Sequence, residues 1–145
     1  MEEYVNNSIY LSIYLPMAFY LVYIFFLLFL NFRVRFEAVK KGDLPASYFE
    51  LFKGTEVPDR VIVYGRHIDN QFQVPPYFMM ACLVAAQVGV VTGFTIAFAW
   101  AFVLCRMVHS YIHLGSNKVL NRAKAYFAGW FFILLIWGQI LTFTL

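Results

Sequence analysis

Long apolar stretches alternate with shorter polar connections along the chain, and the first apolar stretch lies near the start. Residues 8–30 contain no charged side chain. A helix over these positions rises roughly 34 Å, which is enough to cross a hydrocarbon core of about 30 Å. Because Glu2 and Glu3 precede it in place of the basic residues of a signal peptide, we expect a retained membrane helix. Pro16 is expected to kink this helix, which membrane helices tolerate.

A polar region over about 31–69 follows the first span. Four basic residues near its start indicate that the first helix continues past the membrane: Arg33, Arg35, Lys40 and Lys41. Glycines and prolines at positions 42, 45, 54 and 58 then interrupt any helix. We therefore expect loops or short helices here, with the second helix beginning near Val57 and entering the membrane near Val74.

The remaining apolar stretches predict three more spans, over about 74–91, 93–114 and 121–144. Pro75 and Pro76 remove backbone donors at the start of the second span, so we expect a kink there, with a true break as the alternative. Gly115 is the expected C-cap of the third helix and Asn121 the expected N-cap of the fourth. The pattern predicts an all-α integral membrane protein, a bundle of four transmembrane helices in a single domain over residues 1–145.

Composition supports lipid as the solvent of this chain. Hydrophobic residues make up 62% of it and charged residues 13%, against roughly 25% charged residues in soluble domains. The net charge of +3 does not indicate a nucleic-acid partner, because the basic residues flank apolar spans and form no separate basic face. Cys82 and Cys105 lie in apolar segments without metal-ligand spacing and are expected to be buried thiols that form no disulfide with each other.

The distribution of basic residues predicts the orientation. Seven of the eleven Lys and Arg residues lie between residues 31 and 74, and the other four lie between residues 106 and 124. In a four-span bundle the first and third connections share a side. The positive-inside rule therefore places both connections in the cytoplasm and both termini on the other side. A bacterial inner membrane is preferred over the endoplasmic reticulum.

Polar side chains gather near the expected cytoplasmic ends of three helices. They form three groups at helical spacing: Arg66, Asn70 and Gln73; Arg106, His109 and His113; Arg122 and Tyr126. Arg106 lies roughly 13 Å from the end of its span, where a charge is costly unless it is paired or hydrated. Because no acid lies in any span to pair with it, we expect an anionic partner, either a ligand or an acid from a loop or another chain.

Simpler readings of these residues stay open. Arg66 and Arg122 could be positive-inside anchors, and Asn70 and Gln73 could be hydrogen bonds between helices. His109 could be an ordinary core histidine, or could bind a metal or haem with His113, although two histidines alone are a weak signal. A proton-coupled small multidrug exporter is set aside, because it would need an acid within a span and the first span has none.

The same motifs resemble those of the MAPEG superfamily, the membrane-associated proteins in eicosanoid and glutathione metabolism. The resemblance covers nearly the whole chain and rests on four segments in the family's order and spacing: RVRFEAVKKGD, RHIDNQFQVPPYF, RMVHSYIH and NRAKAYF. It implies a homotrimer that holds glutathione between neighbouring subunits at the cytoplasmic side. It also implies a second, lipophilic substrate that arrives from the bilayer.

Carried over residue by residue, the resemblance assigns a role to each polar group. Arg66 and Asn70 would hold the charged and amide groups of glutathione, and Arg122 would stabilise its thiolate. Arg106, His109 and Tyr126 would line the site. Gln73 stands where the family has a glutamate, and His113 where a tyrosine is common. Both belong to the expected binding site and both depart from the family pattern.

Two functions therefore follow from the sequence. The first is a glutathione-dependent transferase or peroxidase that acts on a lipophilic electrophile. The alternative is a non-catalytic structural or accessory subunit of a larger membrane complex, with a degenerate pocket that holds lipid or another anion.

Overall fold

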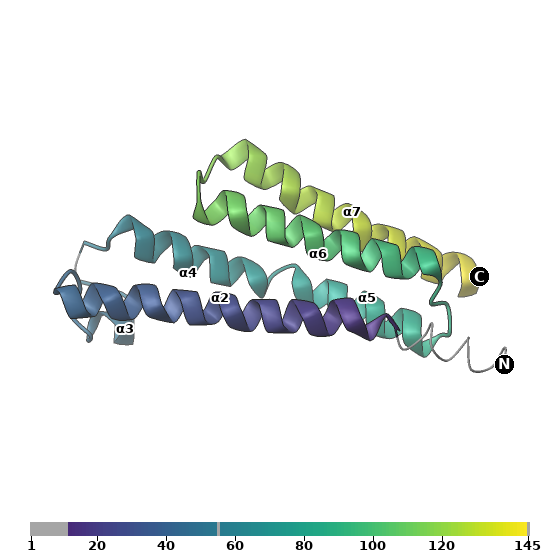
Figure 1. Cartoon of the computed structure of the whole chain (residues 1–145), viewed down its shortest axis with the longest axis horizontal. Coiled ribbons are helices and arrows are strands. Elements are labelled where there is room, and N and C mark those ends of the chain that lie inside the picture. The colour runs from purple at the N-terminus through teal and green to yellow at the C-terminus, as the bar shows by residue number, and fades with distance from the viewer. Residues whose placement is uncertain (1–11, 55, 145) are drawn as a thin grey trace.

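The computed structural model describes residues 12–54 and 56–144, and its regular elements are helices (Figure 1). They are α2 (Tyr14–Lys41), α3 (Tyr48–Leu51), α4 (Asp59–Gln71), α5 (Pro75–Gln87), α6 (Gly93–Leu114) and α7 (Val119–Thr144). The long helix α2 packs beside α4 and α5, and α6 and α7 pack against each other and against this layer. The start of α2 and the end of α7 lie at one end of the bundle, and the connection from α2 to α4 lies at the other.

Among the described residues, three helices are long and apolar enough to cross a membrane: α2, α6 and α7. The remaining predicted span corresponds to α5, whose 13 residues rise only about 20 Å against a hydrocarbon core of about 30 Å. The membrane character predicted from the sequence is confirmed, and the count of four spans stays a prediction.

The second predicted helix is broken into α4 and α5. Residues 72–74 separate them. Pro75 and Pro76 follow at the first two positions of α5, where their missing N–H groups are harmless. In a continuous helix the same two prolines would leave the carbonyls of Gln71 and Phe72 without donors. The structure therefore has the true break that was the alternative, and the expected kink in a continuous helix is wrong.

Helix α2 runs for 28 residues and ends at Lys41, so the predicted extension past the first span is present. Gly42 caps it in the left-handed conformation with φ of 80°, as is usual for glycine at this position. Pro16 lies in the first turn of α2, where its missing donor has no intrahelical partner to lose.

The limits of α6 match the predicted third helix. Thr92 and Thr95 form a reciprocal capping box at its start. Gly115 is its C-cap, as predicted, although its φ of −99° is not left-handed. The N-cap prediction for α7 is wrong, because the helix begins at Val119 and Asn121 lies inside its first turn.

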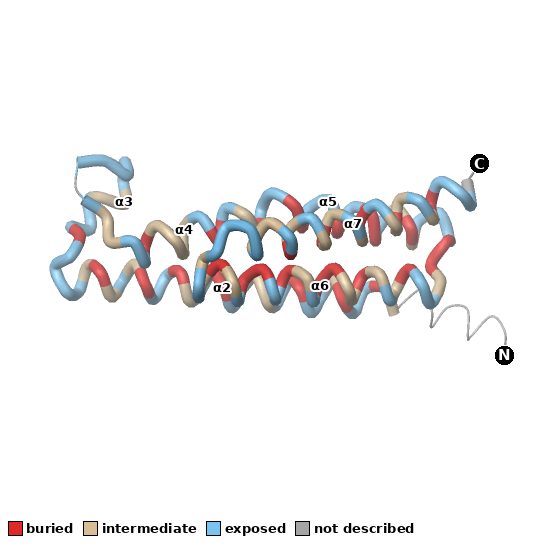
Figure 2. The backbone as a smooth tube through the Cα atoms, turned by 90° about the horizontal axis from the view of Figure 1, so that it is seen from above, coloured by how far each residue is buried: buried red, intermediate tan, exposed pale blue. Residues whose placement is uncertain are grey.

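The main core lies between the helices in the apolar half of the bundle. Tyr20, Phe78 and Phe102 are fully buried there, and the rings of Phe78 and Phe102 stack with centroids 4.2 Å apart. Buried positions alternate with exposed ones along each long helix (Figure 2). Many exposed positions carry large apolar side chains, including Phe25, Phe29 and Phe131, as expected where lipid covers the outer surface. Cys82 and Cys105 are free thiols, as predicted, and Cys82 is buried, but Cys105 is only partly buried.

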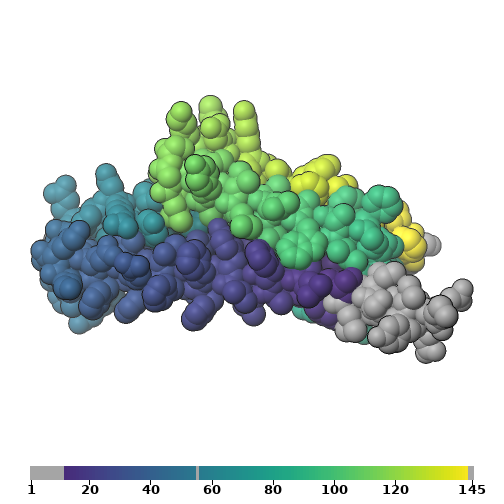
Figure 3. Space-filling view, in the orientation of Figure 1, coloured from purple at the N-terminus to yellow at the C-terminus, as the bar shows by residue number. Residues whose placement is uncertain are grey.

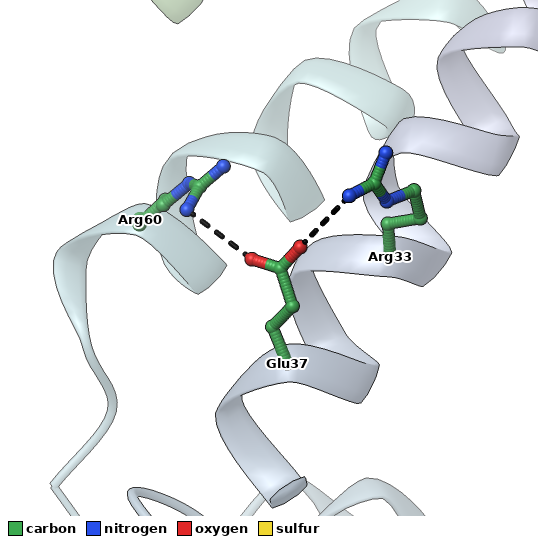
Figure 4. Close-up of polar contacts among 3 residues, drawn as sticks. All are labelled: Arg33, Glu37 and Arg60. Atoms are coloured by element: carbon green, nitrogen blue, oxygen red, sulfur yellow. Dashed lines mark hydrogen bonds and ion pairs between the residues drawn. The ribbon is translucent and has the colours of Figure 1, made fainter. Parts of the chain in front are cut away.

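A smaller apolar cluster holds the end of the bundle around the polar loop. Val34, Ala38, Leu44 and Val61 form it. At its edge, the carboxylate of Glu37 accepts from Arg33 at 3.3 Å and from Arg60 at 3.4 Å (Figure 4). Arg33 is on α2 and Arg60 on α4, so this carboxylate ties the two helices together on the surface.

Candidate functional site

Arg106 lies at the centre of the polar cluster, and its side chain is fully buried. Its guanidinium contacts α2 and α4. Nε donates to the Tyr20 hydroxyl at 3.3 Å, and Nη2 donates to the Asn70 carbonyl at 3.0 Å and to the Gln71 Oε1 at 3.2 Å. The expected costly charge is therefore surrounded by neutral acceptors from its own chain. Nη1 has no hydrogen-bond partner among the described residues.

The break between α4 and α5 supplies one of these acceptors. In an uninterrupted helix the Asn70 carbonyl would accept from the N–H of Val74. Helix α4 ends at Gln71 before that bond can form, and Arg106 donates to the carbonyl instead. The Pro75–Pro76 pair thus determines where a backbone acceptor is available for the buried cation.

Gln71 connects the elements around Arg106. Its Oε1 accepts from the Tyr20 hydroxyl at 2.6 Å as well as from Arg106. Its Nε2 lies 3.1 Å from the Nε2 of His67. Because an amide nitrogen can only donate, that ring nitrogen accepts, and the proton of the neutral ring is on Nδ1. One glutamine therefore joins α2, α4 and α6.

Three buried imidazoles lie together beside this network. The ring centroids of His67, His109 and His113 are 5.0 to 5.8 Å apart. No group of three or more histidine, cysteine or acidic side chains in the described part of the chain could hold a metal ion. The hydrogen bonds of His67 and His113 instead use their Nε2 atoms as acceptors from protein groups.

Arg122 extends from α7 toward this cluster. Its Nη1 lies 2.9 Å from both the His113 Nε2 and the Asn117 Oδ1. Since a guanidinium only donates, the His113 ring accepts and is neutral on that side. Asn117 has φ of 49° in the connection before α7, a conformation that asparagine tolerates better than most residues. The connection between α6 and α7 projects from one side of the molecule (Figure 3).

An open cavity of about 240 Å³ lies next to Arg122. Its wall combines polar groups from three helices with apolar side chains of α7: Asn70, His109, Val119, Arg122, Ala123, Tyr126 and Phe127. The Arg106 guanidinium lies behind this wall, with its Cζ 6.0 Å from the centre of the Tyr126 ring. No acidic side chain of the described residues lines the cavity, and we call it the arginine cavity.

The structure divides the residues that the sequence grouped together. Asn70, His109, Arg122 and Tyr126 line the arginine cavity, and Arg106 and His113 are buried beside it. Arg66 instead lines a second cavity at the loop end, between α2, α3 and α4. Gln73 is exposed in the segment between α4 and α5.

Three polar residues of the cluster were missed by sequence reasoning: Tyr20, His67 and Gln71. The sequence singled out the face of α4 that carries Arg66 and Asn70. The adjacent, buried face, roughly 100° around the helix, carries His67 and Gln71 one turn apart. Their spacing of four in a segment that also carries Ile68 was an available signal for a polar but buried face.

Comparison with known proteins identifies a family for the chain. The model described as the MAPEG family matches residues 13–142, which covers most of the chain. Neither the curated proteins nor the solved structures gave a match.

Proposed function

Because the chain belongs to the MAPEG family, we propose that this membrane protein binds glutathione in the arginine cavity and joins it, through its sulfur, to a lipophilic electrophile. The related activity is reduction of a lipophilic hydroperoxide to the alcohol and water, in which two glutathione molecules are oxidised to the disulfide. The observation that carries the proposal is the position of Arg122. Its guanidinium is held by His113 and Asn117 beside an open cavity without an acidic side chain.

A fixed cation beside a thiol favours the thiolate, because it stabilises the charged form and lowers the thiol pKa. In the transfer reaction the glutathione thiol gives its proton to water at the cytoplasmic side. The thiolate sulfur then forms a bond to the electrophilic carbon as the bond from that carbon to its leaving group breaks, and the leaving group departs with the bonding electron pair. Arg122 is the catalytic residue in this proposal. His113 and Asn117 are positioning residues, since they contact Arg122 and not the thiol.

The cavity of a single chain holds only part of a tripeptide. Its volume of about 240 Å³ is below the roughly 300–1,000 Å³ of most small-molecule sites. A homotrimer would complete it, because the outward-facing Arg66 and Gln73 of a neighbouring subunit could then contact the ligand. Arg106 supports the wall from behind through the Tyr126 ring.

The proposed arrangement in the membrane has four spans, with α5 as the second and shortest. Both polar connections, which carry the Lys and Arg residues, face the cytoplasm, and both termini face the other side. Glutathione would then enter from the cytoplasm, and the second substrate from the lipid of a bacterial inner membrane. Residues 1–145 form one domain in this proposal.

Glutathione binding to detergent-purified protein tests the proposal directly. Titration calorimetry should give saturable binding to wild type, and Arg122→Gln should weaken it about tenfold or more, since hydrogen bonds to charged groups are the stronger class. Lys124→Gln is the matched control, because Lys124 is an exposed cation on the same helix outside the cavity. Equal loss in both variants, or no binding to wild type, would count against the site.

The alternative is a non-catalytic subunit of a larger membrane complex. It is favoured by the burial of Arg106 and His113, whose hydrogen bonds go to their own chain. Wild-type protein that binds no glutathione and co-purifies with a stable membrane complex would support this alternative. Loss of thiol-dependent turnover in Arg122→Gln, with the fold intact, would support the enzyme.

A further inference from the structure

We propose that the loop between α2 and α4 inserts two exposed apolar side chains, Leu51 and Phe52, into the head-group layer of the membrane. We call these two residues the loop tip. The partner of this surface is a lipid layer, and neither residue lines the arginine cavity. The proposal therefore holds whether or not the chain binds glutathione.

The loop tip exposes apolar surface that the described part of the chain leaves uncovered. Leu51 ends α3 and is 74% exposed, and Phe52 is the C-cap of that helix and is 56% exposed. Single exposed apolar side chains are ordinary on protein surfaces, but here two large ones are adjacent. Contiguous apolar surface marks a contact with a partner or with a membrane.

The backbone at Phe52 supports a role for its ring outside the loop. The φ of this residue is 55°, a conformation that is uncommon for bulky side chains and that glycine adopts freely. The Phe52 N–H donates to the Tyr48 carbonyl at 2.7 Å and so closes α3. Glycine would close the helix equally well, so the closure does not account for an aromatic side chain. Residues held in such conformations concentrate at functional sites.

Aromatic contacts hold the loop tip in place against α2. The Phe52 ring packs edge-on against the rings of Tyr48 and Phe49, with centroids 5.6 and 6.1 Å apart. The Arg35 Cζ lies 5.8 Å from the centre of the Phe52 ring, and Leu44 is buried where the loop leaves α2. The exposed segment around α3 projects to one side of the bundle (Figure 2). Because the loop tip is preformed, little conformational entropy is lost when it enters a lipid layer.

The lipid-facing surface of α2 extends to the level of the loop tip. Phe32 and Phe36 continue the exposed apolar positions of this membrane-crossing helix; they are 63% and 58% exposed, and their ring centroids are 6.1 Å apart. Arg35, which contacts the Phe52 ring, lies between them in the sequence. Aromatic side chains are enriched at membrane–water interfaces. This level of α2 and the loop tip therefore belong to one interfacial layer.

The charges beside the loop tip limit how deeply it inserts. Glu50 precedes it, Lys53 follows it, and both are exposed. Charged side chains are costly in hydrocarbon, so the two apolar residues between them reach only the head-group layer and the adjoining ends of the acyl chains. Since the two charges cancel, the contact requires no anionic lipid.

Collision measurements with a nitroxide label at position 51 test the proposal. The label is attached to Leu51→Cys in a chain that also carries Cys82→Ala and Cys105→Ala, in phosphatidylcholine nanodiscs. Oxygen concentrates in lipid, and a nickel chelate stays in water. The ratio of oxygen to nickel collisions should lie between those of two reference positions: Phe29→Cys, on the lipid-facing surface of α2, and Lys41→Cys, at its exposed end. It should exceed the Lys41→Cys ratio several-fold, and a ratio equal to that of Lys41→Cys would overturn the proposal.

The same label distinguishes lipid from a neighbouring protein chain. Protein contact lowers the collision rates of both reagents, in nanodiscs and in detergent alike. Lipid contact lowers the nickel rate and raises the oxygen rate. Low rates with both reagents would overturn the proposal in favour of protein contact.

Phe52→Asn tests the contribution of the ring while preserving the backbone, because asparagine tolerates a positive φ. It should move the collision ratio at position 51 several-fold toward that of Lys41→Cys. Lys53→Asn is the matched control at the next position and should leave the ratio unchanged. An unchanged ratio in Phe52→Asn, or equal shifts in the two variants, would overturn the proposal. The measurement at position 51 needs neither variant, so it decides the matter even where Phe52→Asn fails to fold.

Discussion

Arg106 and Gln71 are joined by a hydrogen bond of 3.2 Å from the guanidinium Nη2 to the side-chain Oε1, between a fully buried cation on α6 and a buried amide on α4. The pair holds α4 against α6 at the point where the second helix is broken. A charge at this depth is thus accommodated without an acid, because neutral oxygens from two other helices surround it.

Replacing Gln71 by Leu should destabilise the protein by about 3 kcal/mol, because it removes an acceptor from a buried cation and a partner from Tyr20 and His67. The measurement is unfolding in mixed detergent, followed by circular dichroism. Gln73→Leu is the matched control, since Gln73 is exposed, and its effect should stay within about 0.5 kcal/mol. Similar losses in the two variants would contradict the central role of Gln71.

Stability should fall as the pH drops below about 6.5. His67 lies in α4, before the span that is proposed to begin near Val74. Burial, followed by the neighbouring His113, His109, Arg106 and Arg122 in that order, lowers the pKa of His67 to about 3. Between the folded pKa of about 3 and the ordinary value of 6.5, His67 is protonated in the unfolded chain but not in the folded chain. The contribution of neutral His67 to the free energy of unfolding is therefore fully present above pH 6.5 and lost toward pH 3.

The check on this pH dependence is the unfolding midpoint from pH 7.5 to pH 4.5 for wild type and His67→Gln. The wild-type midpoint should decline with falling pH, and the variant should decline less steeply because one titrating ring is gone. The same slope in both proteins would show that His67 is not the group responsible.

Asn117→Gly should remove a hydrogen-bond partner of Arg122 without destabilising the fold. Glycine accepts the φ of 49° at this position without strain, so the unfolding midpoint should change little. The Asn117 Oδ1 that accepts from Arg122 is lost, and the proposed glutathione affinity should fall several-fold. Asn117→Ala should instead cost about 1 kcal/mol through backbone strain. Unaltered glutathione affinity in Asn117→Gly would remove Asn117 from the site.

Gly129 and Gly138 offer a matched pair of positions on α7. A Cβ at Gly129 would lie 3.6 Å from the Phe102 ring and 3.9 Å from the Arg106 Cδ, while one at Gly138 meets nothing within 4 Å. Gly129→Leu should therefore overpack the contact between α6 and α7 and destabilise the protein by about 1–3 kcal/mol. Gly138→Leu should leave the unfolding midpoint nearly unchanged, and equal effects of the two would contradict the packing seen at Gly129.

Much of the fold follows from the sequence because lipid-facing helices leave long apolar stretches. The limits of α6 and the extension of α2 past Arg35 could be predicted in this way. The first residues of helices were harder to predict, because a helix start depends on local turn geometry that composition does not specify. Helix α7 begins at Val119, two residues before the predicted Asn121.

The site was only partly accessible to sequence reasoning. Helical spacing shows which residues share a face, but not which face points inward. On α4 the face with Arg66 and Asn70 resembled a known motif, whereas His67 and Gln71 are the buried pair. Tyr20 belonged to a span rich in tyrosine and carried no distinguishing pattern. The hydrogen bonds of Arg106 connect residues of three helices, and the spacing of residues along the chain does not show which residues of different helices are in contact.

The length of α2 sets the height, relative to the lipid, of the cavity at the loop end between α2, α3 and α4, which Arg35 and Arg66 line. From Tyr14 to Arg35 the helix rises about 32 Å, close to the thickness of the hydrocarbon layer. With Tyr14 at one edge of that layer, an upright α2 would carry the Arg35 guanidinium to the level of the lipid phosphates, and Lys40 and Lys41 to the water beyond. In a thicker bilayer this cavity would sink among the acyl chains, so membrane thickness becomes a variable that decides whether it meets head groups or tails.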